Sequence, residues 1–328
     1  MARPRKKLKI LLIEPNYSNK YPPIGLMKLS TYHKMLGHEV VFYKGDLKQF
    51  VIERIASKCI DEFYKIDESV NWNLYKDLFV EYIRTKRKDF LSQIPISSTN
   101  MEILLTDKIN QFKDCYWKKS WEKEPEWDRV FVTTLFTFYW RITIDTINFA
   151  KKLVKDTKNM MVGGVLATIQ AKEVYEATGI KPFEGILNKP GQLDKGNHLI
   201  IDNLPLDYSI LDEIEYKYPM NNAYYGYTTR GCIRKCPFCA VPKLEPVYNS
   251  YIPLRERIEE TRKQYGDQKD LLLMDNNILA SSEFNTIIDD IIACGFGKDA
   301  KFIQPNLLAL SIAHLRSTPV INERANIR

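Results

Sequence analysis

The sequence lacks an apolar run that approaches the roughly 18 residues required for a membrane-spanning helix. Its basic first residues precede only a short strand-like run, and the small-residue cleavage site of a signal peptide is missing. Low-complexity tracts and internal repeats are lacking as well. We therefore expect a cytoplasmic globular protein with no membrane partner.

The 328 residues are 45% hydrophobic and 27% charged, which excludes a disordered or fibrous chain and predicts two domains of about 150 residues each. The net charge of +7 does not identify a polyanion-binding protein, because five positive charges lie in the first nine residues: Arg3, Arg5, Lys6, Lys7 and Lys9. Such a basic arm can contact nucleic acid, but it is more often simply solvated.

Alternating strand and helix patterns predict an α/β fold for residues 1–187. The expected elements are strand 8–13, helix 24–36, strand 39–43, strand 130–134, helix 140–153, strand 160–164 and a third unit over 167–187. Strand–helix–strand units normally cross over right-handed into a parallel sheet. We predict a doubly wound, Rossmann-like parallel sheet whose ligand site would lie at the carboxyl ends of its strands.

Residues 47–127 interrupt this rhythm with charged and aromatic residues at helical spacing, which predicts a helical insert. Its last part, residues 117–127, could stack on bases, but a helix with an apolar stripe and a solvated face is favoured. The pair 163–164 (Gly-Gly) leaves two interpretations open, a close approach of the backbone to a ligand or tight packing. Residues 188–223 are rich in Pro, Gly and Asn, which predicts a linker.

A second α/β domain is expected over residues 224–328. Its elements would be strand 224–228, helix 254–265, strand 270–275, helix 281–295, strand 301–304 and helix 307–316. At about 30 residues per unit, this gives three β/α units and a stub.

Three of the six cysteines, Cys232, Cys236 and Cys239, lie within eight positions after the first strand of this domain. Clustered cysteines in an intracellular chain indicate a metal rather than disulfides. Structural zinc usually requires four protein ligands, but His198 and His314 are far from the cluster. The spacing C-x3-C-x2-C therefore favours three corners of an iron–sulfur cluster with one iron open, with zinc as the alternative.

This motif resembles that of the radical S-adenosylmethionine (SAM) enzymes, with Phe238 as the aromatic residue before the third cysteine. The resemblance implies a [4Fe–4S] cluster on Cys232, Cys236 and Cys239, whose open iron is chelated by SAM. It also implies a (β/α) barrel, here only partial, and reductive cleavage of SAM to a 5′-deoxyadenosyl radical that attacks an unknown substrate. The electron would come from a donor such as flavodoxin or ferredoxin.

In that family, the loop after the second barrel strand commonly contacts the methionine part of SAM. The matching loop is 274–277, so the resemblance implies contacts from Asp275 and Asn276. Gln304 and Asn306, at the end of the third expected strand, would face the same opening. The alternative for Asp275 and Asn276 is a turn capped by their side chains.

Residues 22–40 resemble the N-terminal cobalamin-binding-type domain that precedes many radical SAM barrels. Relatives that bind cobalamin base-off carry a D-x-H-x-x-G motif after the first strand. The matching segment, 14–19, contains no histidine, and His33 and His38 are expected to be surface or packing residues. This departure argues against cobalamin, and the domain is expected to serve substrate binding or docking.

A radical SAM barrel normally has six β/α units, so three units imply a truncated chain, a partner chain that completes the barrel, or a cluster-binding remnant. Two other functions stay open. One is a non-catalytic accessory protein that binds an Fe–S cluster or zinc. The other is an RNA-modifying radical SAM enzyme. The methylthiolating subclass is disfavoured, because it needs three further cysteines and only Cys59 and Cys115 precede the motif.

Overall fold

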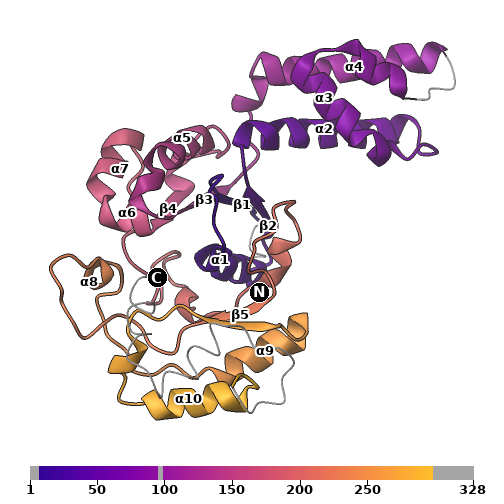
Figure 1. The fold of residues 1–328 in the computed structure, drawn as a ribbon. Coiled ribbons are helices and arrows are strands. Elements are labelled where there is room, and N and C mark those ends of the chain that lie inside the picture. Colours follow the sequence, from indigo (N-terminus) through magenta and orange to yellow (C-terminus); the bar gives the residue numbers. More distant parts are fainter. Residues whose placement is uncertain (1–6, 95–98, 298–328) are drawn as a thin grey trace, which may run out of the picture.

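The first sheet contains four parallel strands in the order β2-β1-β3-β4 (Figure 1). Their bounds are β1 Lys9–Glu14, β2 Glu39–Lys44, β3 Arg129–Thr134 and β4 Met160–Gly164. In register, Leu12 of β1 lies between Phe42 of β2 and Phe131 of β3. The structure is a computed structural model that describes residues 7–94 and 99–297. It confirms the predicted α/β class for the first domain.

Helices cover both faces of this sheet, because successive side chains of a strand point to opposite faces. Ile10 and Leu12 pack on α1 (Ile24–Met35). Leu11 and Ile13 belong to the core that contains α2 (Leu47–Ile66) and α5 (Trp140–Ala150). The strands are apolar on both faces for this reason, which is the pattern that predicted a buried parallel sheet.

The predicted helical insert is present and projects away from the first sheet (Figure 1). It consists of α2, α3 (Lys76–Thr85) and α4 (Thr99–Trp117), with short 3-10 turns between and after them. In a core continuous with that of the sheet, Phe63 packs edge-on against Phe79 and at a tilt against Trp72. In the part of the chain that the structure describes, no helix combines the length and apolarity needed to cross a membrane.

The expected third α/β unit does not end in a strand. After β4 the chain forms α6 (Val165–Ile169) and α7 (Ala171–Thr178), and residues 180–187 then run beside β4 without joining the sheet. The Phe183 N–H donates to the Val162 carbonyl (2.7 Å). A ladder cannot extend from this bond, because Pro182 has no N–H and Gly185 has a left-handed φ of 82°.

The segment expected as a linker is packed against the first domain, and we call residues 188–222 the strap. Ile201, Ile210 and Tyr218 of the strap are buried in the core beneath α1. Polar contacts fix it further, since Arg129 of β3 pairs with Asp194 (2.6 Å) and Ser30 of α1 donates to Asp207 (2.6 Å). The Pro, Gly and Asn content of the strap therefore reflects its irregular path rather than mobility.

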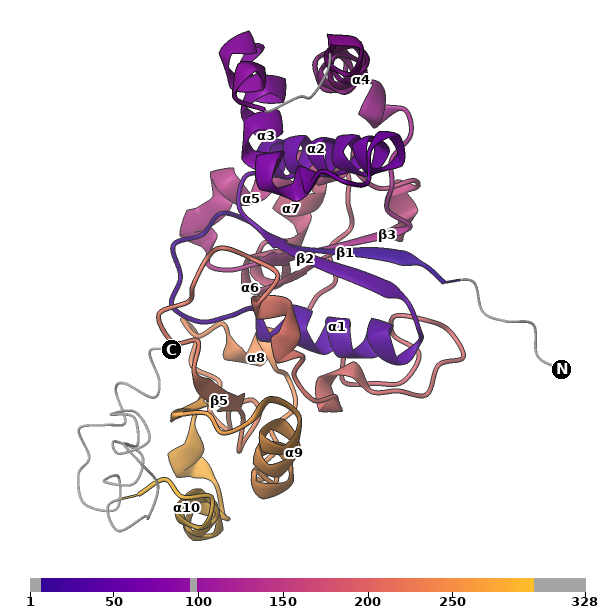
Figure 2. The ribbon, with the colours of Figure 1, turned by 90° about the vertical axis from the view of Figure 1, so that its right-hand side faces the viewer.

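The second domain contains two parallel strands in the described residues, β5 (Ala223–Gly226) and β6 (Asp270–Leu273). Tyr224 and Leu271 face α9 (Arg255–Tyr265) and α10 (Phe284–Ala293). Tyr225 and Leu272 face the opposite way, into the core shared by the strap and α1. The second sheet is thus held on the first domain, with α1 between the two sheets (Figure 2). The expected strand 301–304 and helix 307–316 lie outside the described residues.

Candidate metal centre

The cysteine loop begins at a glycine that the backbone requires. Gly231 has φ +67°, a left-handed conformation that side chains with a Cβ rarely adopt. A Cβ atom at this position would also lie 2.7 Å from the carbonyl oxygen of Val247 and 2.9 Å from that of Glu245. The chain therefore turns sharply at Gly231, immediately before Cys232, with no room for a side chain.

Asp275, expected as a contact to SAM, instead holds the start of the cysteine loop. Its carboxylate accepts hydrogen bonds from Thr228 N (3.0 Å), Thr228 Oγ1 (2.9 Å) and Thr229 Oγ1 (2.6 Å), and from the N–H of Thr229. The side chain is only 7% exposed, and burial raises the pKa of Asp275 against the opposing effect of these bonds. Its oxygens thus position the loop through contacts 46–47 residues away in the sequence, rather than by capping their own turn.

Arg230 connects the loop to the rest of the molecule. Its guanidinium pairs with Asp202 of the strap (2.5 Å) and with Glu245, and it stacks on Tyr227 with 3.6 Å between Cζ and the ring centroid. Glu245 also accepts hydrogen bonds from the Gly231 N–H and from Asn276 Nδ2, each at 2.8 Å. Asn276, the other expected SAM contact, therefore anchors the loop through Glu245.

The three cysteines lie on one partly exposed loop, and Cys232 is the one whose sulfur accepts hydrogen bonds. Cys232 Sγ accepts hydrogen bonds from Asn277 Nδ2 (3.3 Å) and from the N–H of Arg234 (3.4 Å). The Cys239 N–H donates to the Cys236 carbonyl (3.0 Å), which closes a turn around Phe238. Phe238 itself is 92% exposed. Asn277, whose side chain contacts the sulfur, lies in the predicted loop 274–277 but was not among its expected contacts.

By chemical type, though not by the spacing of the thiols in this structure, the donors of the loop suit a thiolate-bound cluster. Three thiols on one segment and two N–H donors aimed at the first sulfur suit Fe–S ligation, in which hydrogen bonds to sulfur tune the cluster. Close to Cys232, the hydroxyl oxygen of Tyr248 is buried and has no hydrogen-bond partner in the described part of the chain. Burial, with the nearby Cys232 and Asp275, raises the pKa of Tyr248. Within residues 7–94 and 99–297, no three His, Cys, Asp or Glu side chains are gathered tightly enough to hold an ion.

Side chains of the protein itself occupy the carboxyl end of β1, the edge at which doubly wound parallel sheets commonly bind ligands. At the carboxyl end of β1, Glu14 is fully buried, pairs with Lys44 (3.0 Å), and accepts hydrogen bonds from Asn19 (2.9 Å) and Tyr218. The residues of segment 14–19 thus contact protein groups and supply no imidazole. His33 is buried with its Nδ1 3.0 Å from Nδ1 of His38, which makes it a packing residue.

In the pair 163–164, Gly164 serves tight packing, whereas a Cβ at Gly163 would make only an ordinary contact, 3.8 Å from the Phe183 carbonyl oxygen. Gly164 has φ +109°, and a Cβ there would lie 2.9 Å from the backbone nitrogen of Thr134. Thr134 Oγ1 donates to the Gly163 carbonyl and accepts from the Ala167 N–H, both at 3.0 Å. The pair therefore lets α6 begin directly against β3. Gln304, the last expected site residue, and Asn306 lie outside the described residues.

Comparisons with known proteins give this chain no relative: no protein-family model, no curated protein and no solved structure matches it.

Proposed function

We propose that this protein is a radical SAM enzyme that holds a [4Fe–4S] cluster on Cys232, Cys236 and Cys239. The observation that carries the proposal is the loop itself. Three cysteines at C-x3-C-x2-C spacing follow a buried parallel strand. Gly231, directly before the first of them, packs closely against the backbone of Glu245 and Val247, and Asn277 donates a hydrogen bond to Cys232 Sγ. Because the loop offers three thiols, one iron would keep an open position for SAM.

When bound, such a cluster supplies the single electron that cleaves SAM to methionine and a 5′-deoxyadenosyl radical. The chain's own residues would hold the cysteine loop in position and orient its thiols. Asp275 fixes the loop entrance through Thr228 and Thr229, while Arg230 fixes it against the strap. The Asn277 amide and the Arg234 N–H stabilise negative charge on Cys232.

The test is anaerobic reconstitution with iron and sulfide, followed by EPR of the reduced protein with and without SAM. We expect a [4Fe–4S] signal that SAM perturbs, and 5′-deoxyadenosine on reduction with dithionite. Cys236→Ala should lose both, whereas Cys294→Ala, which removes a buried thiol in the core of the second domain, should retain both. A cluster signal unchanged by SAM, with no deoxyadenosine formed, would favour the non-catalytic accessory protein. Stoichiometric zinc in place of iron would favour a structural zinc site.

Partners of this proposed enzyme would meet the cysteine loop. Phe238 and Ile233 are 92% and 58% exposed beside the ligating cysteines, and exposed apolar side chains around a reactive centre favour coverage by another surface. We propose that a partner chain that completes the barrel provides this cover, that a flavodoxin or ferredoxin donates the electron, and that the protein works in the cytoplasm.

A surface on the helical insert favours RNA as the substrate class. The end of α3 meets the end of α4, since Trp117 Nε1 donates to the Ile83 carbonyl (2.8 Å) and Lys86 Nζ lies 3.7 Å over the Trp117 ring. Basic side chains lie at both helix ends around this contact. We call them together the basic surface: Arg84, Lys86, Arg87, Lys88, Lys113, Lys118 and Lys119. Within the described part of the chain, Glu81, Asp89 and Asp114 pair with Arg84, Arg87 and Lys118. Cations remain in excess beside a half-exposed indole, a combination that suits single-stranded RNA.

A further inference from the structure

Tyr248 follows the cysteine loop in the sequence and lies beside the start of that loop in the structure. The backbones of Arg230 and Asn249 exchange two hydrogen bonds, of 3.0 and 2.9 Å, in an antiparallel bridge. One step along this pairing, Tyr248 comes opposite Gly231. The two segments are close there, because a Cβ at Gly231 would lie 3.2 Å from the carbonyl carbon of Val247, the atom bonded to the Tyr248 nitrogen. Tyr248 is therefore held across from the glycine that begins the cysteine loop.

The hydroxyl of Tyr248 is buried and has no hydrogen-bond partner among the described residues. Burial raises the pKa of Tyr248, and the negative charges of Cys232 and Asp275 raise it further, which places both groups near the hydroxyl. The Asp275 carboxylate accepts its hydrogen bonds from Thr228 and Thr229 instead. A hydroxyl hydrogen rotates to suit any acceptor in reach, and a buried donor without one costs free energy. The burial of this donor beside the cysteine loop therefore calls for a functional explanation.

The sulfur of Cys232 is the acceptor that this position favours. Cys232 directly follows Gly231, the residue opposite Tyr248. Its sulfur already accepts hydrogen bonds from Asn277 and from the N–H of Arg234. A neutral thiol is a weak acceptor, whereas a metal-bound thiolate carries negative charge and attracts further donors. A hydroxyl that finds no acceptor beside a thiol thus gains one when the thiolate forms.

We propose that the Tyr248 hydroxyl donates a hydrogen bond to the sulfur of Cys232 when this cysteine binds a metal. The bond holds the sulfur in place and stabilises its negative charge, so Tyr248 is a positioning residue. In an iron–sulfur cluster the bond also favours the reduced state, because hydrogen bonds to sulfur raise the reduction potential. That the metal is a [4Fe–4S] cluster rests on the proposed function, whereas the hydrogen bond itself requires only a metal-bound thiolate.

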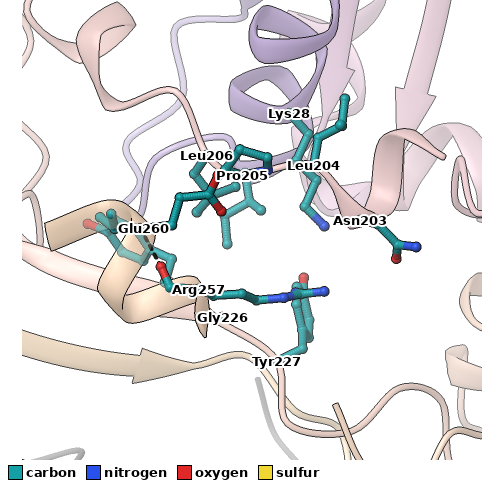
Figure 3. A pocket seen from close by; sticks show the side chains of 12 residues that line it. Lys28, Asn203, Leu204, Pro205, Leu206, Gly226, Tyr227, Arg257 and Glu260 are labelled. Carbon is teal, nitrogen blue, oxygen red and sulfur yellow. Dashed lines mark hydrogen bonds between the residues drawn. The ribbon is translucent and has the colours of Figure 1, made fainter. Parts of the chain in front are cut away.

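Tyr225 offers a matched control in the same domain. Its hydroxyl is also buried without a hydrogen-bond partner in the described part of the chain. Tyr225 lines a hollow between α1, the strap, β5 and α9 (Figure 3), and within the described residues no cysteine lines this hollow. After burial, the groups that raise the pKa of Tyr225 include Tyr208 and Asp270 but no cysteine. Tyr225→Phe and Tyr248→Phe thus remove the same kind of hydroxyl, and only the second removes it at the cysteine loop.

The first experiment uses the full chain with its thiols reduced. In urea unfolding with metals removed, both Phe variants should raise the equilibrium constant for folding about fivefold, which is about 1 kcal/mol, since each loses an unsatisfied buried donor. In a titration with Co²⁺, followed by thiolate-to-cobalt absorption, Tyr248→Phe should bind Co²⁺ about fivefold more weakly than the wild type. Tyr225→Phe should bind Co²⁺ like the wild type.

The second experiment is an EPR-monitored redox titration of the reconstituted [4Fe–4S] cluster. At a fixed ambient potential, the ratio of reduced to oxidised cluster should be about fivefold lower in Tyr248→Phe than in the wild type, with the same iron content. Tyr225→Phe should match the wild type. In D₂O, electron–nuclear double resonance of the reduced cluster should show that Tyr248→Phe loses the coupling of an exchangeable deuteron.

Equal Co²⁺ affinity and equal potential in Tyr248→Phe and the wild type would overturn the proposal. A loss of stability in metal-free Tyr248→Phe would also overturn it, because the hydroxyl would then bond within the protein. A weaker affinity for SAM at an unchanged potential would do the same, because the hydroxyl would then face SAM.

The Co²⁺ comparison does not depend on iron or on SAM. A cluster that fails to form, or that yields no deoxyadenosine, therefore contradicts only the proposed function when Tyr248→Phe still weakens Co²⁺ binding. SAM cleavage with an unchanged potential and unchanged Co²⁺ affinity in Tyr248→Phe contradicts only the role of Tyr248.

Discussion

Asn277 donates a hydrogen bond from its side-chain amide to the sulfur of Cys232 at 3.3 Å, across 45 residues of sequence. The contact joins the loop after β6 to the loop after β5, which are adjacent because the two strands pair in parallel from Ala223 with Asp270 to Gly226 with Leu273. The carboxyl ends of the two strands therefore deliver a sulfur and its hydrogen-bond donor to the same point.

Removal of this donor should shift the redox potential of the reconstituted cluster. Hydrogen bonds to ligating sulfur stabilise the more negative, reduced state, so Asn277→Ala should lower the midpoint potential without loss of iron. An EPR-monitored redox titration measures the shift. Asn285→Ala, an exposed asparagine on α10, is the matched control and should leave the potential unchanged. Equal potentials in Asn277→Ala and the wild type would show that this bond does not reach the cluster.

Gly231→Ala should destabilise the fold by at least about 2 kcal/mol, since the left-handed backbone costs a Cβ residue about 1–2 kcal/mol and the carbonyl oxygens of Val247 and Glu245 must also move. Urea unfolding measures this loss. Gly179→Ala provides the comparison, because Gly179 is left-handed, with φ +70° and ψ 2°, and has no atom within 4 Å of its Cβ position. It should show only the backbone cost. Equal losses of stability in the two variants would mean that the cysteine loop accommodates a Cβ at residue 231 at no cost beyond that of the backbone conformation.

His33 should make the protein sensitive to acid. Burial first, and then Arg129 and His38, lower the pKa of His33 to about 3, from an ordinary value of 6.5. Between pH 6.5 and pH 3, His33 is therefore protonated in the unfolded chain but neutral in the folded chain. The free energy of unfolding is fully present above pH 6.5 and falls by about 1.4 kcal/mol per pH unit as the pH drops toward 3.

Denaturant unfolding of the wild type and of His33→Phe at pH 7 and pH 5 isolates this effect. The phenyl ring suits the aromatic surroundings of Tyr32 and Phe131. Asp194, which also faces His33, has its pKa lowered mainly by the hydrogen bond from Arg129 and loses stability in the same direction, but it is present in both proteins. We expect a smaller pH dependence in His33→Phe. Identical pH dependence would rule out His33 as its source.

The basic surface should control RNA affinity if RNA is the substrate. Lys88→Glu with Lys119→Glu should weaken tRNA binding and reduce the salt slope by about 1 for each phosphate that the protein no longer neutralises. Filter binding across a salt series measures both quantities. Lys172→Glu, on the exposed side of α7, is the control and should have little effect. Binding that is weak in the wild type, or unchanged by the double reversal, would contradict the RNA interpretation.

The sequence predicted the elements that its periodicity encodes. The apolar runs of β1 and β3, the helical spacing of residues 47–66 and the strand before Cys232 all lie where the pattern placed them. The expected third unit over 167–187 is wrong at its end, where no strand forms, because Pro182 and Gly185 prevent a ladder that the apolar spacing alone would allow.

The polar contacts of the candidate site could not be predicted in this way. Asp275 and Asn276 were expected to face a ligand, but their partners Thr228 and Glu245 lie 47 and 31 residues away. The burial of the strap could not be predicted from the sequence for a similar reason. Its core residues, among them Ile201 and Tyr218, have neither helical nor strand spacing, so only the tertiary structure shows that they pack beneath α1.

The ion pair between Asp202 and Arg230 has a consequence for the order of folding. Asp202 belongs to the strap, which reaches its position by packing on α1, and both segments are synthesised before the cysteine loop. N-terminal domains generally fold first during synthesis. Asp202 would thus already be in position when the cysteine loop is synthesised. Arg230 could pair with it, so the loop would adopt its conformation before any metal binds.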